Sequence, residues 1–306
     1  MAVDAPVSAP VRTSSPVPYS VIYSVPEGEI LEPLPTPEEI EDSTELFSQR
    51  QARCTARVGR GYVVKFGSVV DPVEGENMTF VRQHARGARV PKVYAIYQRE
   101  VTPHTTITYI IMEYIAGHPL EALWGSLNTS QKRDVCTQLR DAFVSLRAAP
   151  GLGYFGSVDR TKPRDDIFWA DVPHRRDAGA VNTEAEFIQA LVDKYTVYCG
   201  NIEPQKTDYY RRVLPTALKG NNDSVFTHND LRRKNILISN DGTVVLLGWA
   251  YAGWYPSYWD YAKAIHHCDW RDDWHEYIGL ILEEYPNQVP WVSTLRNDLW
   301  NTRIVR

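Results

Sequence analysis

The stretch from Val225 to Gly248 constrains the fold more than any other part of the sequence. It begins with a short apolar run at Val225–Phe226, which is expected to be a β-strand, and continues through a polar loop. Ile236–Ser239 and Thr243–Leu247 are two further apolar runs, separated by Asn-Asp-Gly. This triplet is typical of a tight turn between antiparallel strands, so the sequence predicts a β-hairpin directly after the loop.

The polar loop carries His228, Asp230 and Asn235 at the spacing H-x-D-x-x-x-x-N. This is the spacing of phosphoryl-transfer loops, in which the aspartate faces the attacking hydroxyl and the asparagine holds a metal. The far end of the hairpin should then carry a second, metal-binding aspartate. The sequence has Gly248 there, so it predicts a phosphotransferase-type loop with an altered metal site.

Composition excludes several classes of protein. The 306 residues are 43% apolar and 23% charged, which is ordinary for a globular chain. A net charge of −5 argues against a partner that is a nucleic acid, and no apolar run approaches the ~20 residues needed to span a bilayer. The first residues lack a signal peptide's pattern, and the four cysteines lie far apart. We expect a cytoplasmic protein with reduced thiols and no membrane partner; the oligomeric state stays open.

The sequence divides into three regions. Residues 1–37 hold eight of the twenty prolines, which predicts a Pro-rich N-terminal arm. Within this arm, Tyr19–Val25 is an apolar patch that can pair as an edge strand. Residues 38–114 are rich in short β-like runs and predict an N-lobe, and residues 115–306 predict a mainly helical C-lobe that carries the hairpin.

The predicted elements give an α+β, two-lobed fold of the protein-kinase-like kind. The N-lobe is expected to contain helices at Pro37–Phe47 and Val73–Ala85 and strands at Cys54–Val58, Tyr62–Phe66, Pro91–Tyr97 and Thr105–Tyr114. In the C-lobe, a capping pattern at Asn128 predicts a helix over Thr129–Leu146. A second capping pattern at Thr183 predicts another helix that runs through Tyr198. Two more helices are predicted at Tyr255–Ile265 and Asp272–Tyr285.

With these parts in this order, the chain resembles the aminoglycoside-phosphotransferase and choline-kinase branch of the protein-kinase-like fold. It is most similar to the small-molecule phosphotransferase-like proteins of fungal genomes. The resemblance covers about residues 38 to 270, and its anchors are the motifs Val63–Gly67, Glu76–Met78, Met112–Gly117, Gly153–Ser157, Phe226–Leu237 and Ala252–Trp259.

The resemblance implies a nucleotide site. Lys65 would offer its charge to the ATP phosphates, and Glu76 on the next helix would fix that lysine, with Glu74 as the competing choice. Met112 to Tyr114 would form the hinge that addresses the adenine.

The resemblance also implies roles on the polar loop. Asp230 would lie beside the hydroxyl of the small-molecule substrate and accept its proton. His228 would support the loop through hydrogen bonds, with acid–base work as the alternative. Asn235 would contact the nucleotide-bound Mg²⁺.

The chain departs from the family at this site. Members usually read His-Gly-Asp-Leu-His-x-x-Asn, whereas Asn229 and Arg232 stand here in place of the glycine and the second histidine. Members then read Ile-Asp-Trp-Glu, whereas Gly248 and Ala250 replace both acids. Mg²⁺ prefers anionic oxygens, so loss of its carboxylate would cost on the order of 10²–10⁴ in rate. The family implies ATP and Mg²⁺ as cofactors, whereas Gly248 and Ala250 provide no carboxylate for the metal.

Three functions are compatible with this pattern. The first is a repurposed biosynthetic enzyme, as in secondary metabolism, that uses Asp230 or His228 as acid or base without phosphoryl transfer. The second is an ATP-dependent O-phosphotransferase with a weakened metal site, acting on a small hydroxylated metabolite. The third is a pseudokinase-like binding module. A zinc site at His266 and His267 is disfavoured, because adjacent helical side chains diverge by ~100°.

Overall fold

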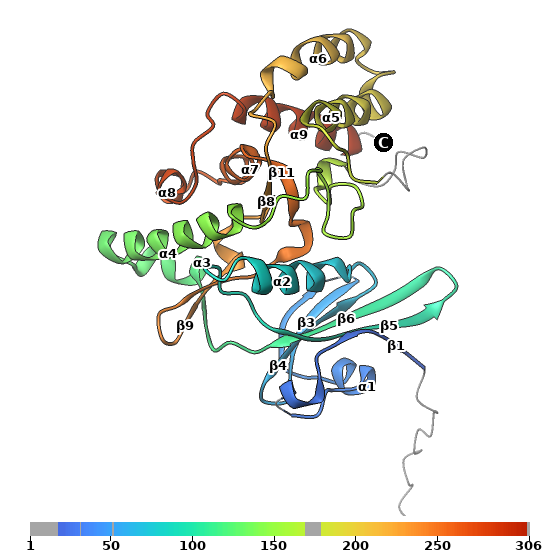
Figure 1. Cartoon of the computed structure of the whole chain (residues 1–306), viewed down its shortest axis with the longest axis vertical. Helices are drawn as coiled ribbons and strands as arrows, with labels where there is room; N and C mark the ends of the chain where they lie inside the picture. The colour runs from blue at the N-terminus through green and yellow to red at the C-terminus, as the bar shows by residue number, and fades with distance from the viewer. Residues whose placement is uncertain (1–17, 31, 51, 169–178, 305–306) are drawn as a thin grey trace, which may run out of the picture. The chain divides into compact units, whose positions relative to one another are not determined.

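The structure is a computed structural model that describes residues 18–30, 32–50, 52–168 and 179–304 (Figure 1). The chain folds into two compact units. The first comprises residues up to Val70 together with Tyr94–Ile111, and the second comprises Asp71–Val93 and the chain from Met112 onward. An antiparallel sheet in the first unit and a mainly helical second unit confirm the predicted α+β fold class. The domain limits proposed from the sequence stay predictions.

The first unit is built on a six-stranded sheet with the order β1-β5-β6-β4-β3-β2. Tyr19–Val25 was predicted as an edge strand, and β1 does lie at one edge, antiparallel to β5. The predicted hairpin is β3 paired with β4. Residues 1–17 of the predicted arm lie outside the described residues. The strands are β1 Ser20–Ser24, β2 Leu46–Arg50, β3 Arg53–Val58, β4 Tyr62–Gly67, β5 Val93–Thr102 and β6 Thr105–Glu113.

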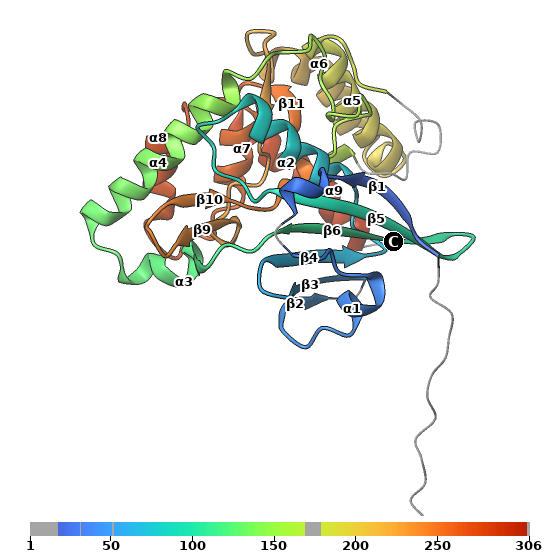
Figure 2. The ribbon, with the colours of Figure 1, turned by 60° about the horizontal axis from the view of Figure 1, so that its bottom comes forward.

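The helix predicted over Pro37–Phe47 is shorter in the structure. Helix α1 covers only Pro37–Glu41, and it begins with a capping box in which Thr36 and Glu39 exchange hydrogen bonds. Leu46 and Phe47 belong instead to β2, which pairs with β3; in Figure 2, β3 lies between β2 and β4. The prediction failed because β2 forms a hairpin with β3, the strand that follows it directly, and the acidic pattern before it carries no signal for that pairing.

The core of the first unit lies on one face of its sheet. Alternation along β4 buries Tyr62 and Val64, and Tyr109 and Ile111 are buried on β6. Ile40 of α1 is fully buried against the same cluster. The sheet is therefore held by apolar packing between its strands and α1.

The second unit is mainly helical. Two small antiparallel pairings, β7-β9-β10 and β8-β11, lie within it. Its helices are α2 Val73–His84, α3 Leu120–Leu123, α4 Thr129–Arg147, α5 Glu184–Cys199, α6 Pro204–Ala217, α7 Trp259–His266, α8 Trp274–Ile281 and α9 Val289–Ile304. Its strands are β7 Gly117–Pro119, β8 Ser224–Thr227, β9 Ile236–Ser239, β10 Val244–Leu246 and β11 Gly253–Pro256.

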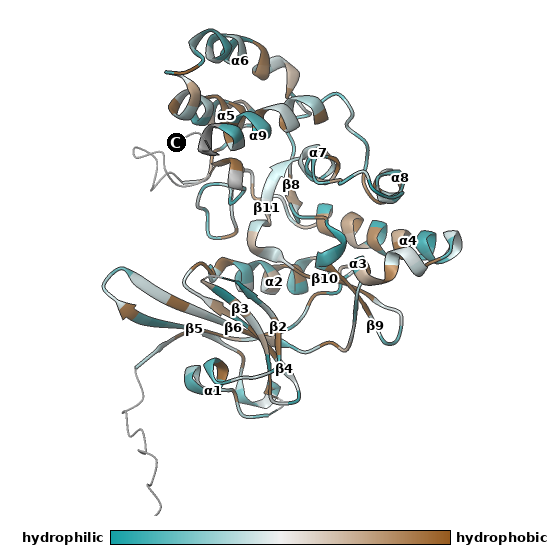
Figure 3. Cartoon of the chain, turned by 180° about the vertical axis from the view of Figure 1, so that it is seen from behind, coloured by the Kyte–Doolittle hydropathy of each residue, from teal (hydrophilic) through white to brown (hydrophobic). Residues whose placement is uncertain are grey.

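Capping residues correctly predicted where two of these helices begin. Asn128 and Gln131 form the predicted capping box at the start of α4, and Thr183 caps α5. Hydrophobic and hydrophilic bands alternate along α4 in Figure 3, because its apolar residues recur at helical spacing and only one side is buried.

The helix predicted over Tyr255–Ile265 begins later than expected. Tyr255 and Pro256 belong to β11, whose partner is β8 in antiparallel register. Pro256 disfavours helical geometry at Tyr255, the residue before it. Tyr255 adopts an extended conformation instead and pairs with β8. Helix α7 therefore begins at Trp259.

Aromatic side chains fill the core of the second unit. Phe187 from α5, Tyr255 from β11 and Trp259 from α7 are all fully buried and contact each other at ring-centroid distances of 5.0–6.0 Å. This packing joins α5 and α7 to β11, whose partner β8 leads into the polar loop. Among the helices that the structure describes, none is long and apolar enough to cross a membrane.

Candidate functional site

The polar loop is fixed at both ends by strand pairing. It leaves β8 at Thr227, and β8 pairs with β11 (Figure 1). It enters β9 at Ile236, and β9 pairs with β10 (Figure 2). The predicted hairpin is confirmed, with Ile236 opposite Leu246 and a turn that Gly242 closes at φ +83°. The two strand pairs therefore fix both ends of the loop that carries these side chains.

His228 is fully buried, and both of its ring nitrogens are used by the main chain. Nδ1 accepts the N–H of Asp230 at 3.2 Å, and Nε2 lies 3.0 Å from the carbonyl oxygen of Leu247. These contacts require the neutral tautomer with the proton on Nε2. Burial lowers the pKa of His228, which keeps this form at neutral pH. The ring joins the loop to the end of the hairpin.

Asn229 explains one departure from the family pattern. Its φ is +65°, the left-handed region that favours glycine and that asparagine tolerates better than most residues. Its N–H donates to the buried carboxylate of Asp260 at 2.8 Å, and its amide nitrogen donates to Tyr251 at 3.0 Å. Burial raises the pKa of Asp260. Asparagine can therefore replace glycine here without changing the path of the loop.

Asp230 is held from two sides. Arg232 binds both of its carboxylate oxygens, with Nη2 2.6 Å from Oδ2. The side-chain amide of Asn235 also donates to Oδ2, at 2.7 Å, and to the main-chain carbonyl of Asp230. Burial works to raise the pKa of Asp230, but the bonds and charge of Arg232 outweigh it and bring that pKa to about 2. The carboxylate is thus ionised and neutralised by Arg232 at pH 7.

Gly248 lies directly against Asn235. Its backbone has φ +78°, and a Cβ atom at this position would come within 2.8 Å of the Asn235 side chain. Asn235 is also tied to the hairpin through the N–H of Leu247, which donates to its carbonyl at 2.8 Å. The amide of Asn235 fills the space that a side chain at residue 248 would enter, and it is turned toward Asp230.

These residues do not fit a bound Mg²⁺. Kinase-type sites supply one or two carboxylates to the ion. Here Gly248 supplies none, and Asp230 is already bound by Arg232 and Asn235. Across the described ranges, no group of three or more His, Cys, Asp or Glu side chains converges to hold a metal.

The residues predicted for the nucleotide lie in both units. Lys65 is a half-buried residue of β4, opposite Thr55 of β3, in the first unit. Glu76 is on α2 in the second unit, where burial and the charges of Asp159 and Asp71 raise its pKa. Glu74, the competing choice, is buried on the same helix. The pairing of Lys65 with Glu76 stays a prediction.

The predicted hinge spans the end of β6. Met112 is nearly buried there, Tyr114 is half-buried, and Glu113 between them accepts a 2.5 Å hydrogen bond from Arg89. The main-chain N–H of Glu113 donates to Lys92 at 2.8 Å. Adenine binding by this segment stays a prediction.

Sequence reasoning missed a buried ionic cluster in the second unit. Asp165, fully buried, accepts hydrogen bonds from Trp259 at 3.0 Å and Lys263 at 2.9 Å, and it is also bound by Arg296. Arg296 and Lys263 are 131 and 98 residues away along the chain. Asp165 stands in the charged run Arg-Asp-Asp, which has the composition of an ordinary loop, so no local signal distinguishes it.

Arg232 sets the pKa of Asp230, and this can be measured. In an Arg232→Gln variant, the Asp230 pKa should rise from about 2, because the neutral amide no longer favours the charged carboxylate. Carboxyl-detected NMR titration of wild-type and variant protein measures the change. Arg211→Gln, which removes an exposed partner of Asp208, is the matched control and should leave the Asp230 titration unchanged. An Asp230 pKa that does not move would assign its low value to Asn235 and the loop backbone instead.

Comparison with known proteins places the chain. The model of a phosphotransferase enzyme family, APH, matches residues 43–286. A search of curated protein sequences finds no match. The crystal structure of aminoglycoside phosphotransferase APH(4)-Ia is 18% identical, with 87% of this chain and 83% of that chain covered and a TM-score of 0.52.

Two further solved structures are similar. A thermostable mutant of APH(4)-Ia, in a ternary complex with AMP-PNP and hygromycin B, is 19% identical over 87% of this chain and 86% of that chain, with a TM-score of 0.53. The GDP and kanamycin complex of APH(2")-IIia is 12% identical over 88% and 94%, with a TM-score of 0.55. At these identities the likeness shows a shared protein-kinase-like fold. Together with the family match over residues 43–286, it shows that this chain belongs to the phosphotransferase enzyme family.

Proposed function

We propose that this chain is a small-molecule enzyme that uses Asp230 on its ligand and does not transfer phosphate from Mg-ATP. One observation carries the proposal: the position that should bring a metal-binding carboxylate is Gly248, and Asn235 beside it donates to Asp230 instead. Arg232 is also bound to Asp230, so the loop holds the Asp230 carboxylate in place. It lacks the oxygens that a metal needs. A biosynthetic role in secondary metabolism is part of this proposal.

Asp230 is the group on the loop that can exchange a proton with a ligand. It is ionised at neutral pH, so it accepts a hydrogen bond from a hydroxyl or an acidic C–H or N–H. A ligand that draws Arg232 away removes the main cause of the low pKa and makes Asp230 a stronger base. His228 acts through the loop, because its two nitrogens are occupied by main-chain groups.

The alternative is an ATP-dependent O-phosphotransferase with a weakened metal site. Family membership favours it, and the similar structures hold AMP-PNP with hygromycin B or GDP with kanamycin. In this alternative, Lys65, Glu76 and the hinge at Met112–Tyr114 would take the nucleotide, and Asn235 would take Mg²⁺. The absence of a carboxylate at Gly248 weighs against it.

Labelled ATP distinguishes the two. With Mg²⁺ and a panel of hydroxylated metabolites, the wild-type protein is expected to transfer no more γ-phosphate than an Asp230→Asn variant. The isosteric amide removes the charge and keeps the size of the side chain, so it separates chemistry from folding. Transfer by the wild-type protein that requires both Mg²⁺ and Asp230 would establish the phosphotransferase instead.

A second assay separates an enzyme from a pseudokinase-like binding module. Metabolite mixtures are incubated with wild-type and Asp230→Asn protein, and consumption is followed by mass spectrometry alongside thermal stabilisation. The proposal expects a compound that stabilises both proteins and is consumed only by the wild type. A compound that stabilises the wild type and is never consumed would indicate the binding module.

A further inference from the structure

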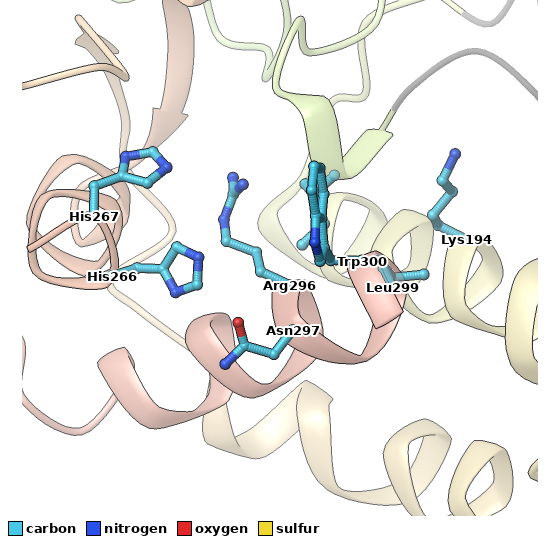
Figure 4. A pocket seen from close by; sticks show the side chains of 8 residues that line it. Lys194, His266, His267, Arg296, Asn297, Leu299 and Trp300 are labelled. Atoms are coloured by element: carbon cyan, nitrogen blue, oxygen red, sulfur yellow. The ribbon is translucent and has the colours of Figure 1, made fainter. Parts of the chain in front are cut away.

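The second unit contains a cavity of about 320 Å³ between the end of α7 and the helix α9, which α5 also borders. This volume is within the range of sites for small molecules. His266 at the end of α7 and His267 directly after it reach the cavity, and Arg296, Asn297 and Trp300 reach it from α9 (Figure 4). In the figure, both imidazoles lie on the same side of the Arg296 side chain, and the Asn297 amide lies below His266, away from the guanidinium.

The polar wall of this cavity suits an anion. Its two charged side chains, Lys194 and Arg296, are cationic, and no carboxylate is among the described residues that line it. Burial lowers the pKa of His266 to about 4 and that of His267 to about 3, and nearby cations add to the effect. Each ring is therefore neutral at pH 7 and offers one N–H and one acceptor nitrogen.

The wall is also rigid. The guanidinium of Arg296 is nearly buried and bound by the fully buried Asp165, which Lys263 binds at 2.9 Å as well. Nδ1 of His267 is buried and makes no hydrogen bond to any described residue. A fixed cation beside a buried ring nitrogen that still lacks a partner is the arrangement expected of a preorganised polar site.

This wall lies within electrostatic range of the polar loop. The charges of Arg232 and Asp230 both act on His267, and that of Lys263 acts on both His267 and Asp230. All of these residues belong to the second unit. His267 is therefore the side chain of the cavity wall on which the charges of both Asp230 and Arg232 act.

We infer that this cavity binds a small carboxylate with an apolar or aromatic body. The carboxylate would take hydrogen bonds from Arg296, from the two imidazoles and from the Asn297 amide, and the body would pack on Leu299 and Trp300. The inference gives a substrate class for the proposed function. It rests on that function only for what Asp230 then does, and binding itself does not require it.

Benzoate is a suitable probe, with benzylamine as its cationic counterpart. Saturation-transfer NMR and tryptophan fluorescence on the full chain should detect benzoate, and not benzylamine. Asn297 is exposed, so Asn297→Asp should fold normally and weaken benzoate binding about tenfold or more, because it places a negative charge in the wall. Asn301→Asp makes the same chemical change one turn later on α9, at an exposed residue outside the lining, and should weaken binding less than twofold.

The outcomes separate the two proposals. Failure of wild-type protein to bind benzoate, preference for benzylamine, or equal weakening by the two aspartate variants would overturn the anion site. Phenyl phosphate is run in parallel, and tighter binding of it than of benzoate would overturn the choice of a carboxylate. Benzoate binding is measured without turnover, so it is expected even if the proposed chemistry at Asp230 is wrong.

Discussion

A Gly248→Asp variant is expected to gain a Mg²⁺-dependent response to ATP that the wild-type protein lacks. The new carboxylate would point at the Asn235 side chain, and a carboxylate with an amide oxygen is a ligand set that Mg²⁺ accepts. At about 100 times the dissociation constant, binding adds roughly 2.7 kcal/mol to the free energy of unfolding. That corresponds to a rise of about 5 °C in the melting temperature.

The same substitution has a structural cost. A Cβ at Gly248 would stand 2.8 Å from the Asn235 amide, so Asn235 has to rotate and give up its bonds to Asp230. The positive φ of Gly248 adds strain of about 1 kcal/mol for a non-glycine residue. Without ligand, the variant should therefore melt a few degrees below the wild type.

Gly248→Asn is the matched control, because it has the same Cβ and the same backbone strain without the negative charge. Thermal-shift titrations with ATP, with Mg²⁺ and with both should show the response only in the aspartate variant. A response of the wild-type protein to Mg-ATP would contradict the proposed function. A response of neither variant would mean that the carboxylate at residue 248 is not what the metal site lacks.

The parts of the site that could be predicted are those set by short-range chemistry. The hairpin β9–β10 follows from two apolar runs around Asn-Asp-Gly, and its turn has the glycine at the positive φ that the turn requires. The start of α4 follows from Asn128 and Gln131 in the same way. In each case the residues that determine the structure are only a few positions apart.

The parts that could not be predicted depend on partners distant in sequence. Tyr255 lies in a strand because β8, some thirty residues earlier, pairs with it. Arg232 is visible in the sequence only as a departure from a family pattern. Its hydrogen bonds to Asp230 depend on the conformation of the loop. A pattern of residue types shows which groups are present, and it does not show which of them a carboxylate is bound to.

Replacement of Asp165 by asparagine is expected to lower the free energy of unfolding far more than the same change at an exposed ion pair. Its carboxylate is fully buried and is shared by Lys263, Arg296, the indole N–H of Trp259 and the main-chain N–H of Ile167. The neutral amide cannot balance two cations that are themselves nearly buried. Removing one partner of a buried ion pair typically costs about 3–5 kcal/mol, so urea unfolding should show a loss of that size.

Asp208→Asn makes the same chemical change at an exposed ion pair with Arg211 and should cost less than about 0.5 kcal/mol. If Asp165→Asn lost no more than this control, the two cations would be balanced by something other than Asp165. The cluster also fixes Arg296, which lines the cavity proposed to bind a carboxylate. The variant should therefore broaden the NMR signals of His266 and His267 below its melting temperature, whereas Asp208→Asn should leave them sharp. A stability loss without any change at these histidines would make Asp165 a folding residue with no part in the cavity.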